Sequence, residues 1–288
     1  MWNLIRIAVT RTAVGTWLGK IPFVRRAYDQ YYWSRKMNAF SGVYQTYESA
    51  AAACEMDHHR VGWNDADLAQ NLVTDDVPRR RSLGDAGEFK AADKPVFVGQ
   101  TSTFAVLLWL SKLVKPGCRI VDVGGAGGIV YCQYRDYFKL PDGATWTVVD
   151  MPETVARGRA AAERAGTTEL TFETDLAAIK ACDILISSGC IQYMPPEGFA
   201  KFCKLSELAY AVIINKIALV DRPNYWSRQS FVSTSSPYLF ANGRQFIQIF
   251  TDSGLKLKDC WHVPEITCDI AFAPRHRLSQ TTGVVFVR

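Results

Sequence analysis

The sequence lacks several features that would place it in a whole class of proteins. No stretch of about 20 residues is apolar and free of charge, so no transmembrane helix is predicted. The eight cysteines include no C-x-x-C pair, and the only adjacent histidines, His58 and His59, have diverging side chains, so we expect no metal site. The 20 glycines and 12 prolines are ordinary numbers for 288 residues, which excludes a collagen-like or proline-rich chain.

The composition is that of a globular protein. Hydrophobic residues make up 48% of the chain, aromatic residues 12% and charged residues 21%, which suits one large domain with an extension. Most cysteines lie within apolar runs, as expected of reduced thiols in a protein core. We find no recognisable export signal, so we expect a cytoplasmic protein.

The net charge of +5 is unevenly distributed along the chain. Residues 1–36 hold seven of the 33 basic residues and one of the 28 acidic residues, so this segment is +6 and the remainder is −1. The body of the chain therefore lacks the basic surface of a nucleic-acid-binding protein.

The basic N-terminal segment is also amphipathic. Residues 1–33 mix cations with Trp2, Trp17, Phe23 and several aliphatic residues. Such a helix either packs on its own domain or lies at a membrane surface, here the inner membrane face. Both interpretations stay open from the sequence.

Three segments differ in texture: a basic amphipathic segment over 1–37, an extension or lid over 38–95 that ends in a long loop, and a regular domain over 96–288. The last segment alternates apolar strands with helices, which is typical of a parallel sheet. We predict strands at 119–123, 145–150, 170–173, 183–187 and 211–215, helices at 102–114, 152–165 and 197–208, and an antiparallel closing pair at 256–263 and 284–288.

A glycine-rich turn follows the first of these strands, at residues 120–128 (IVDVGGAGG). Glycines at such a place let the backbone approach a ligand closely, at the edge where parallel sheets bind ligands. The dinucleotide fingerprint G-x-G-x-x-G is absent, because Val130 stands where its last glycine would be. A nucleotide-dependent oxidoreductase therefore becomes the less favoured interpretation.

The turn has the pattern acid-x-Gly-x-small-x-Gly, with Asp122, Gly124, Ala126 and Gly128, and it includes Gly125. This resembles motif I of the class I S-adenosylmethionine-dependent methyltransferases, with alanine at the usual middle glycine. The resemblance implies S-adenosyl-L-methionine as cofactor. It also implies a Rossmann-like α/β fold with a seven-stranded sheet of order 3-2-1-4-5-7-6, strand 7 antiparallel, here with an N-terminal helical extension.

Two further acids fall in register with that family. The resemblance implies that Asp150 binds the ribose hydroxyls and that Asp175 lies by the adenine amino group. From the residues alone, Asp150 also suits a helix cap before Pro152, and Asp175 a cap or a surface acid.

A narrower resemblance rests on residues 40–50 (FSGVYQTYESA) and 187–193 (SSGCIQY) together with the glycine turn. These segments are similar to a bacterial family of methyltransferases associated with surface-polysaccharide gene clusters. The resemblance implies O-methylation of a sugar or glycolipid-linked acceptor in surface polysaccharide biosynthesis. A protein that keeps the fold and binds ligand without turnover remains the alternative.

The acceptor is expected beside the fourth strand. We expect Ser188 and Gly189 to approach the donor, and Gln192 and Tyr193 to hydrogen-bond the acceptor. A helix-start turn with Tyr193 packed inside is the alternative. Residues 220–243 are predicted to form a long irregular substrate loop or a structural cover.

A general base would assist transfer to an alcohol. His262 is the one histidine on a predicted strand of the catalytic sheet, and an imidazole pKa near 6.5 suits this role. A core histidine bonded to backbone is the alternative for this residue.

Overall fold

The chain forms two compact units whose segments alternate along the sequence. The structure, a computed structural model, describes residues 7, 11–31, 33, 37–56, 60, 61, 63, 89–91, 94–96, 101–135, 137–231 and 234–288. Unit 1 comprises 1–65, 218–246 and 264–281, and unit 2 comprises 66–217, 247–263 and 282–288. This division differs from the three segments 1–37, 38–95 and 96–288 that the sequence texture suggests, because two later segments of the chain return to unit 1.

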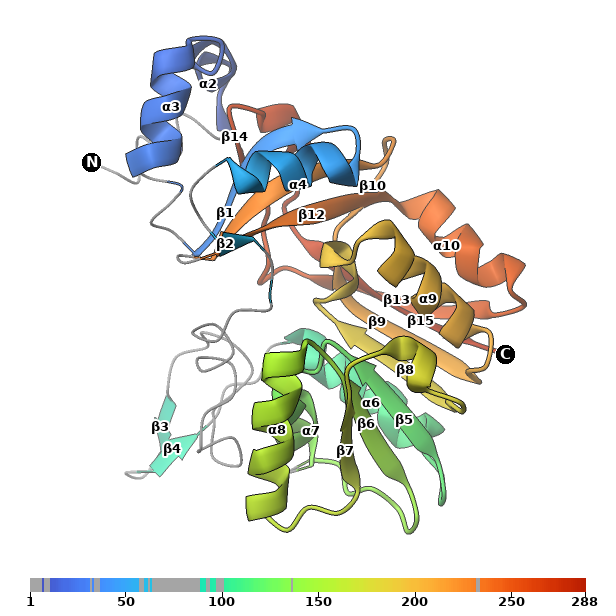
Figure 1. Ribbon diagram of the computed structural model, residues 1–288. Coiled ribbons are helices and arrows are strands. Elements are labelled where there is room, and N and C mark those ends of the chain that lie inside the picture. Colours follow the sequence, from blue (N-terminus) through green and yellow to red (C-terminus); the bar gives the residue numbers. More distant parts are fainter. Residues whose placement is uncertain are drawn as a thin grey trace. The chain divides into compact units, whose positions relative to one another are not determined.

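Unit 2 contains a seven-stranded sheet (Figure 1). Its strand order is β13-β15-β9-β8-β5-β6-β7, which in chain order is 6-7-5-4-1-2-3. Strands β7, β6, β5, β8 and β9 are parallel, and β15 runs antiparallel to β9. The predicted fold class is thereby confirmed. The strands are β5 (Arg119–Val123), β6 (Thr145–Val149), β7 (Leu170–Glu173), β8 (Ile184–Ser188), β9 (Ala211–Ile217), β13 (Lys256–Val263) and β15 (Thr281–Val287).

Three of the helices in this part of the chain, α6 (Thr101–Leu113), α8 (Pro152–Arg164) and α9 (Pro196–Ser206), occur where the sequence predicts them. Helix α8 begins with proline and is followed by Gly166 at φ +64°, the usual signals for a start and a stop. It packs on β7, and the buried Trp146 and Phe172 belong to the same core. The other helices are α7 (Ile129–Tyr134) and α10 (Gly243–Asp252), with short 3-10 helices η2 (Ala126–Gly128), η3 (Leu176–Ala178) and η4 (Ile191–Tyr193).

Unit 1 is built on a second sheet, with the order β10-β12-β11-β1-β14 and β2 paired to β12. Its strands are β1 (Met37–Tyr44), β2 (Arg60–Val61), β10 (Leu219–Val220), β11 (Tyr225–Phe231), β12 (Thr234–Asn242) and β14 (Ile270–Ala271). The prediction of an irregular substrate loop over 220–243 is therefore wrong. Tyr225 stacks on Phe240 with ring centroids 4.6 Å apart, and Tyr238 is buried, so these aromatic residues form the core of this sheet.

The N-terminal segment packs on unit 1. Helices α2 (Ala13–Leu18) and α3 (Pro22–Tyr31) place Leu18, Val24 and Tyr28 against the buried Phe272. Arg11 pairs with Asp269, with an N–O distance of 2.8 Å. Helix α4 (Tyr47–Glu55) begins with a capping box between Thr46 and Ser49, and η5 (Pro274–His276) follows β14.

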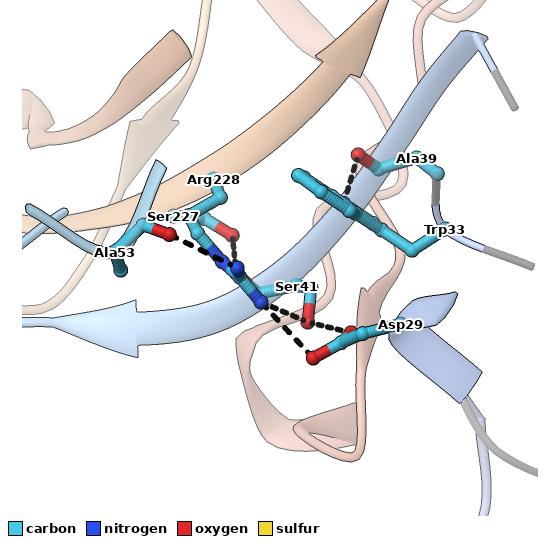
Figure 2. Close-up of polar contacts among 7 residues, drawn as sticks. All are labelled: Asp29, Trp33, Ala39, Ser41, Ala53, Ser227 and Arg228. Atoms are coloured by element: carbon cyan, nitrogen blue, oxygen red, sulfur yellow. Dashed lines mark hydrogen bonds and ion pairs between the residues drawn. The ribbon is translucent and has the colours of Figure 1, made fainter. Parts of the chain in front are cut away.

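A buried arginine ties α3 to this sheet (Figure 2). The Arg228 side chain is 6% exposed and donates to Asp29 Oδ2 at 3.1 Å, Ser41 Oγ at 3.3 Å and the Ala53 carbonyl at 3.2 Å. Its guanidinium lies 4.7 Å from the centre of the Trp33 ring. A buried cation without these partners would be costly, so Asp29 in α3 is part of the fold of unit 1.

Few other features bear on function. Strands β3 (Phe89–Ala91) and β4 (Lys94–Val96) form an antiparallel hairpin. Of the helices that are described, none combines the length and the apolar character needed to cross a membrane. Five of the eight cysteines are buried, consistent with core thiols, whereas Cys260 is exposed. The His58-His59 pair lies outside the described residues.

Candidate functional site

The glycine turn after β5 is a tight backbone feature of unit 2. Gly124, Gly127 and Gly128 have φ values of +77°, +68° and +91°, a region that only glycine enters without strain. A Cβ on Gly124 would lie 2.3 Å from Cys190 Cβ, and one on Gly125 would lie 2.4 Å from Asp122 Oδ2. The turn is therefore held against the Cys190 side chain with no room for side chains of its own.

Ala126 replaces the middle glycine and still takes the conformation that the turn requires. Its φ is +49°, in the left-handed region where alanine costs about 1–2 kcal/mol. Its backbone N–H donates to Asp150 Oδ2 at 2.9 Å. The carboxylate at the end of β6 thus fixes the turn at the end of β5.

Asp122 lies beneath the turn in a fully buried position. Trp146 Nε1 donates to its Oδ2 at 3.2 Å, while Oδ1 has no hydrogen-bond partner among the described residues. Burial raises the pKa of Asp122 to about 7, and the nearby Asp150 charge adds to this rise, while the Trp146 hydrogen bond opposes it. An unpaired buried carboxyl oxygen at this place suits a ligand that carries a hydrogen-bond donor.

Asp150 is half-buried and accepts one backbone hydrogen bond on each oxygen. Met151 N–H donates to Oδ1 at 2.7 Å and Ala126 N–H donates to Oδ2. Burial raises the pKa of Asp150, and the two backbone bonds oppose that rise. A carboxylate has about four acceptor positions, so each oxygen retains capacity for a ligand hydroxyl. The structure places Asp150 directly after β6, as predicted. It does not show the alternative role of a helix cap, because Met151 is the N-cap of α8 and no side chain caps the first turn of that helix.

Asp175 is placed differently from the other two acids. It is exposed, it caps η3 by accepting the Ala177 N–H at 3.0 Å, and its carboxylate pairs with Lys201 at 3.0 Å. These hydrogen bonds lower the pKa of Asp175. Its described contacts are those of the alternative, a cap and surface acid, and its role beside adenine stays a prediction.

The segment after β8 gathers four of the predicted residues at the carboxyl end of the sheet. Ser188 ends β8, Gly189 turns the chain at φ +76°, and Gln192 and Tyr193 belong to η4. Gln192 is 4% exposed, and its Oε1 has no hydrogen-bond partner among the described residues. Tyr193 is half-buried. Cys190, in the same segment, touches the glycine turn as described above.

His262 does not join this group. It lies exposed on the edge strand β13, and strands β15 and β9 stand between β13 and β8. The alternative of a core histidine does not hold for this exposed side chain either. The structure thus separates His262 from Gln192 and Tyr193, the other two residues predicted to be catalytic.

Three residues near the site were missed in the sequence. Asn215 and Lys216 lie near the carboxyl end of β9, and Trp261 of β13 donates its Nε1–H to Asn215 Oδ1 at 3.1 Å. Asn215 in turn donates to Ser188 Oγ at 3.2 Å. The rule that ligands bind at the carboxyl ends of parallel strands applies equally to the fifth strand and could have indicated Asn215 and Lys216.

Comparison with known proteins gives structural neighbours only. No protein-family model and no curated protein sequence matches the chain. The chain is similar to magnesium protoporphyrin IX methyltransferase from Synechocystis PCC 6803 with bound S-adenosylmethionine, at 18% identity over 66% of this chain and 79% of that chain, with a TM-score of 0.45.

Two other neighbours are similar in extent. A 1,6-didemethyltoxoflavin-N1-methyltransferase from Burkholderia thailandensis has 14% identity over 66% of this chain and 79% of that chain, with a TM-score of 0.47. A S-adenosylmethionine-dependent methyltransferase from Aquifex aeolicus has 11% identity over 77% of this chain and 97% of that chain, with a TM-score of 0.45. At such identities, what each protein binds is a property of that protein.

Proposed function

We propose that this chain is an S-adenosylmethionine-dependent methyltransferase that O-methylates a sugar or a glycolipid-linked acceptor. The observation that carries the enzyme class is the coupling of the turn after β5 to the acid ending β6, through the Ala126–Asp150 hydrogen bond. Both strands belong to the sheet whose strand order is 3-2-1-4-5-7-6. The sugar acceptor and a bacterial setting in surface polysaccharide biosynthesis are supported by the sequence resemblance of residues 40–50 and 187–193. A cytoplasmic location is supported by cysteines that lie mostly within apolar runs.

The residues at the turn fit this cofactor. Gly124 and Gly125 let the turn pack directly against Cys190 and Asp122, and Asp122 Oδ1 is a buried acceptor without a partner in the described part of the chain. Asp150 keeps acceptor capacity for ribose hydroxyls, which charge-assisted hydrogen bonds would hold. In this proposal Asp122, Asp150 and the turn bind the cofactor.

The chemistry asks mainly for positioning. Bound S-adenosylmethionine supplies a methyl group on a sulfonium; transfer to a hydroxyl forms an O–C bond, breaks an S–C bond and releases the hydroxyl proton. The chain must hold the acceptor oxygen in line, and effective positioning of this kind supplies much of such a rate acceleration. We assign that task to Gln192 and Tyr193, and we leave His262 out because it lies on the exposed edge strand.

Titration calorimetry with S-adenosylmethionine, S-adenosylhomocysteine and NAD in parallel tests the enzyme class. We expect both sulfur compounds to bind and NAD not to bind. Product analysis against nucleotide sugars and lipid-linked saccharides should then show S-adenosylhomocysteine released together with a methylated acceptor. Binding of NAD alone would indicate an oxidoreductase, and cofactor binding with no turnover on any acceptor would indicate a binding protein.

We also propose that the N-terminal segment contacts an anionic membrane surface. Val14, Trp17 and Phe23 are 61%, 62% and 79% exposed although other side chains of α2 and α3 pack on unit 1, and the cations Lys20 and Arg26 are exposed beside them. Aromatic side chains next to cations are typical of helices at a membrane interface.

Co-sedimentation with anionic lipid vesicles tests this contact. We expect the full chain to bind at low salt, and replacement of both Trp17 and Phe23 by Ser to abolish binding while Asp29 continues to pair with Arg228. Leu208→Ser, which changes an exposed apolar residue of unit 2, is the matched control and should bind normally. Full chain that stays in the supernatant at low salt would contradict the proposal.

A further inference from the structure

Strand β9 ends in a bulge that gives Lys216 an unusual backbone conformation. Ile214 pairs with Val284 and Ile217 with Thr282, so Asn215 and Lys216 together oppose the single residue Gly283. Lys216 takes φ +64°, one of four residues other than glycine with positive φ in the described part of the chain. Bulges of this kind redirect a side chain, and strain of this kind gathers at functional sites.

The bulge directs Lys216 toward the turn after β8. A Cβ added to Gly189 would lie 3.7 Å from Lys216 Cδ and 3.9 Å from Gln192 Nε2, so both side chains border that glycine. The Lys216 ammonium is two bonds beyond Cδ. The Lys216 side chain and the buried Gln192 carboxamide, whose Oε1 has no partner among the described residues, therefore lie on the same side of the turn at Gly189.

A chain of hydrogen bonds fixes the polarity of Ser188 beside them. Trp261 Nε1–H can only donate, so Asn215 must turn its oxygen to Trp261 and its NH₂ group to Ser188. Ser188 Oγ accepts that bond, so its own hydroxyl proton can be donated to a different acceptor. Gly283 leaves room for the Trp261 ring in this chain of hydrogen bonds, because a Cβ at position 283 would lie 2.0 Å from Trp261 Cε2.

We propose that Ser188, Gln192 and Lys216 form an acceptor subsite for a sugar whose hydroxyl stands next to an oxyanion, a carboxylate or a phosphate. The oxyanion accepts from the Ser188 hydroxyl and the Lys216 ammonium, and the sugar hydroxyl donates to Gln192 Oε1. This proposal rests on the proposed function, and it assigns Ser188 to the acceptor rather than to the cofactor.

Binding of matched sugars to protein saturated with S-adenosylhomocysteine tests the subsite. The probes are glucuronate, glucose 6-phosphate and glucose, measured by calorimetry. We expect at least one of the two anionic sugars to bind tenfold or more tightly than glucose, and the ranking of carboxylate against phosphate identifies the oxyanion. Equal binding of all three sugars, or binding of none, overturns the proposal.

Variants separate a binding role from a structural one. Lys216→Met should remove the preference for the anionic sugar, Lys216→Arg should keep most of it, and Ser188→Ala should reduce it several-fold. Lys216→Gly should also remove the preference while raising the melting temperature, because glycine relieves the positive φ. Retained preference in Lys216→Gly overturns the proposal.

Failure of the subsite is distinguishable from failure of the proposed function. If wild-type protein does not bind S-adenosylhomocysteine at all, the methyltransferase proposal fails first. If it binds S-adenosylhomocysteine with unchanged affinity in every variant while no variant alters sugar preference, the subsite alone is wrong. The cofactor affinity of each variant is therefore measured before the sugars are added.

Discussion

The two ends of the strands in the seven-stranded sheet of unit 2, called here the amino edge and the carboxyl edge, differ in whether their charged and polar groups have partners within the chain. At the amino ends of β5 and β8, Asp183 accepts the Arg119 N–H at 2.8 Å and two further bonds from its guanidinium at 2.9 Å. At the same edge Arg288 donates to three backbone carbonyls, those of Glu207, Ala209 and Ser253. Each of these charges is matched by a partner within the chain.

At the carboxyl edge the same sheet leaves groups unmatched. Asp122 Oδ1 and Gln192 Oε1 are buried without a partner among the described residues. At this edge Ala126 and Lys216 have positive φ values, which strain residues other than glycine. At the amino edge the positive φ values before β5, β6 and β7 belong to Gly117, Gly143 and Gly166, which adopt them without strain.

We interpret this difference as one between an end of the sheet that serves stability and an end that binds a ligand. Burying an unpaired polar atom costs about 1–3 kcal/mol, and strained backbone costs a similar amount for each residue. A fold carries such costs where another molecule completes the contacts. Substitutions matched between the two edges therefore test this interpretation.

The largest contrast is expected between Gly124→Ala and Gly117→Ala. Both glycines have φ near +75°, so both variants pay about 1–2 kcal/mol for the left-handed backbone. The new Cβ meets nothing within 4 Å at Gly117 but lies 2.3 Å from Cys190 Cβ at Gly124. Overpacking of that kind costs a further 1–3 kcal/mol or so.

Melting curves and calorimetry separate the two variants. Gly117→Ala should melt a few degrees lower and bind S-adenosylmethionine normally, whereas Gly124→Ala should melt lower still and lose at least tenfold in affinity. Normal affinity in a folded Gly124→Ala variant would mean that the turn does not face the cofactor.

The next contrast is between two carboxylates, Asp150 at the carboxyl edge and Asp183 at the amino edge. Asp150→Ala should weaken S-adenosylmethionine binding by about 1.5–3 kcal/mol, the range for hydrogen bonds to a charged group. Asp183→Ala should lower the melting temperature, because Arg119 loses its partner, and leave the affinity unchanged. Equal affinities in the two variants would remove Asp150 from the cofactor site.

The pH dependence of stability reports on Asp122. Its pKa is raised by burial to about 7, so between the unfolded value near 3.8 and pH 7 the folded chain holds a proton that the unfolded chain releases. The contribution of Asp122 to the free energy of unfolding is therefore present at low pH and lost as the pH rises through 7. The slope is on the order of 1 kcal/mol for each pH unit between pH 5 and pH 6.5.

Asp122→Asn isolates this contribution, because it removes the titration and keeps an oxygen for Trp146. Burial lowers the pKa of His276, which gives the opposite slope in the same window, so the difference between wild type and variant is the quantity to measure. Denaturant unfolding at several pH values should show wild-type stability falling relative to the variant from pH 5 upward. Parallel curves would show that Asp122 does not titrate in this window.

The strands of unit 2 could be predicted because they satisfy a local rule. Residues 119–123 and 145–149 are short runs rich in β-branched residues, set between turn signals. The glycine turn was found for the same reason, since its residues are adjacent in sequence. The polarity of Ser188 depends on Trp261 through Asn215, residues far apart in the chain, and no local pattern contains it.

The sheet of unit 1 could not be predicted in this way. Strand β11 carries Arg228 and Gln229, polar residues that the sequence analysis places in a long irregular substrate loop or a structural cover. They are buried because Asp29 and Asn38, nearly 200 positions earlier, supply their partners. A strand whose burial depends on such distant partners has no periodic apolar signal.

The smallest expected effect concerns Ala126, the alanine at the middle position of the turn. Ala126→Gly removes the left-handed strain of about 1–2 kcal/mol but makes the unfolded chain more flexible, which returns about 0.4–1 kcal/mol. The net result is a gain of about 0.5–1 kcal/mol in stability. The backbone N–H that donates to Asp150 is unchanged, so S-adenosylmethionine affinity should stay within about twofold of wild type.

Gly166→Ala is the matched change at the amino edge. This glycine has φ +64°, and a Cβ there meets nothing within 4 Å, so the variant should lose the same amount that Ala126→Gly gains. Denaturant unfolding measures both differences. If Ala126→Gly destabilises the protein, its methyl group packs in the turn, and the strain at this edge is compensated within the chain instead of being left for a ligand.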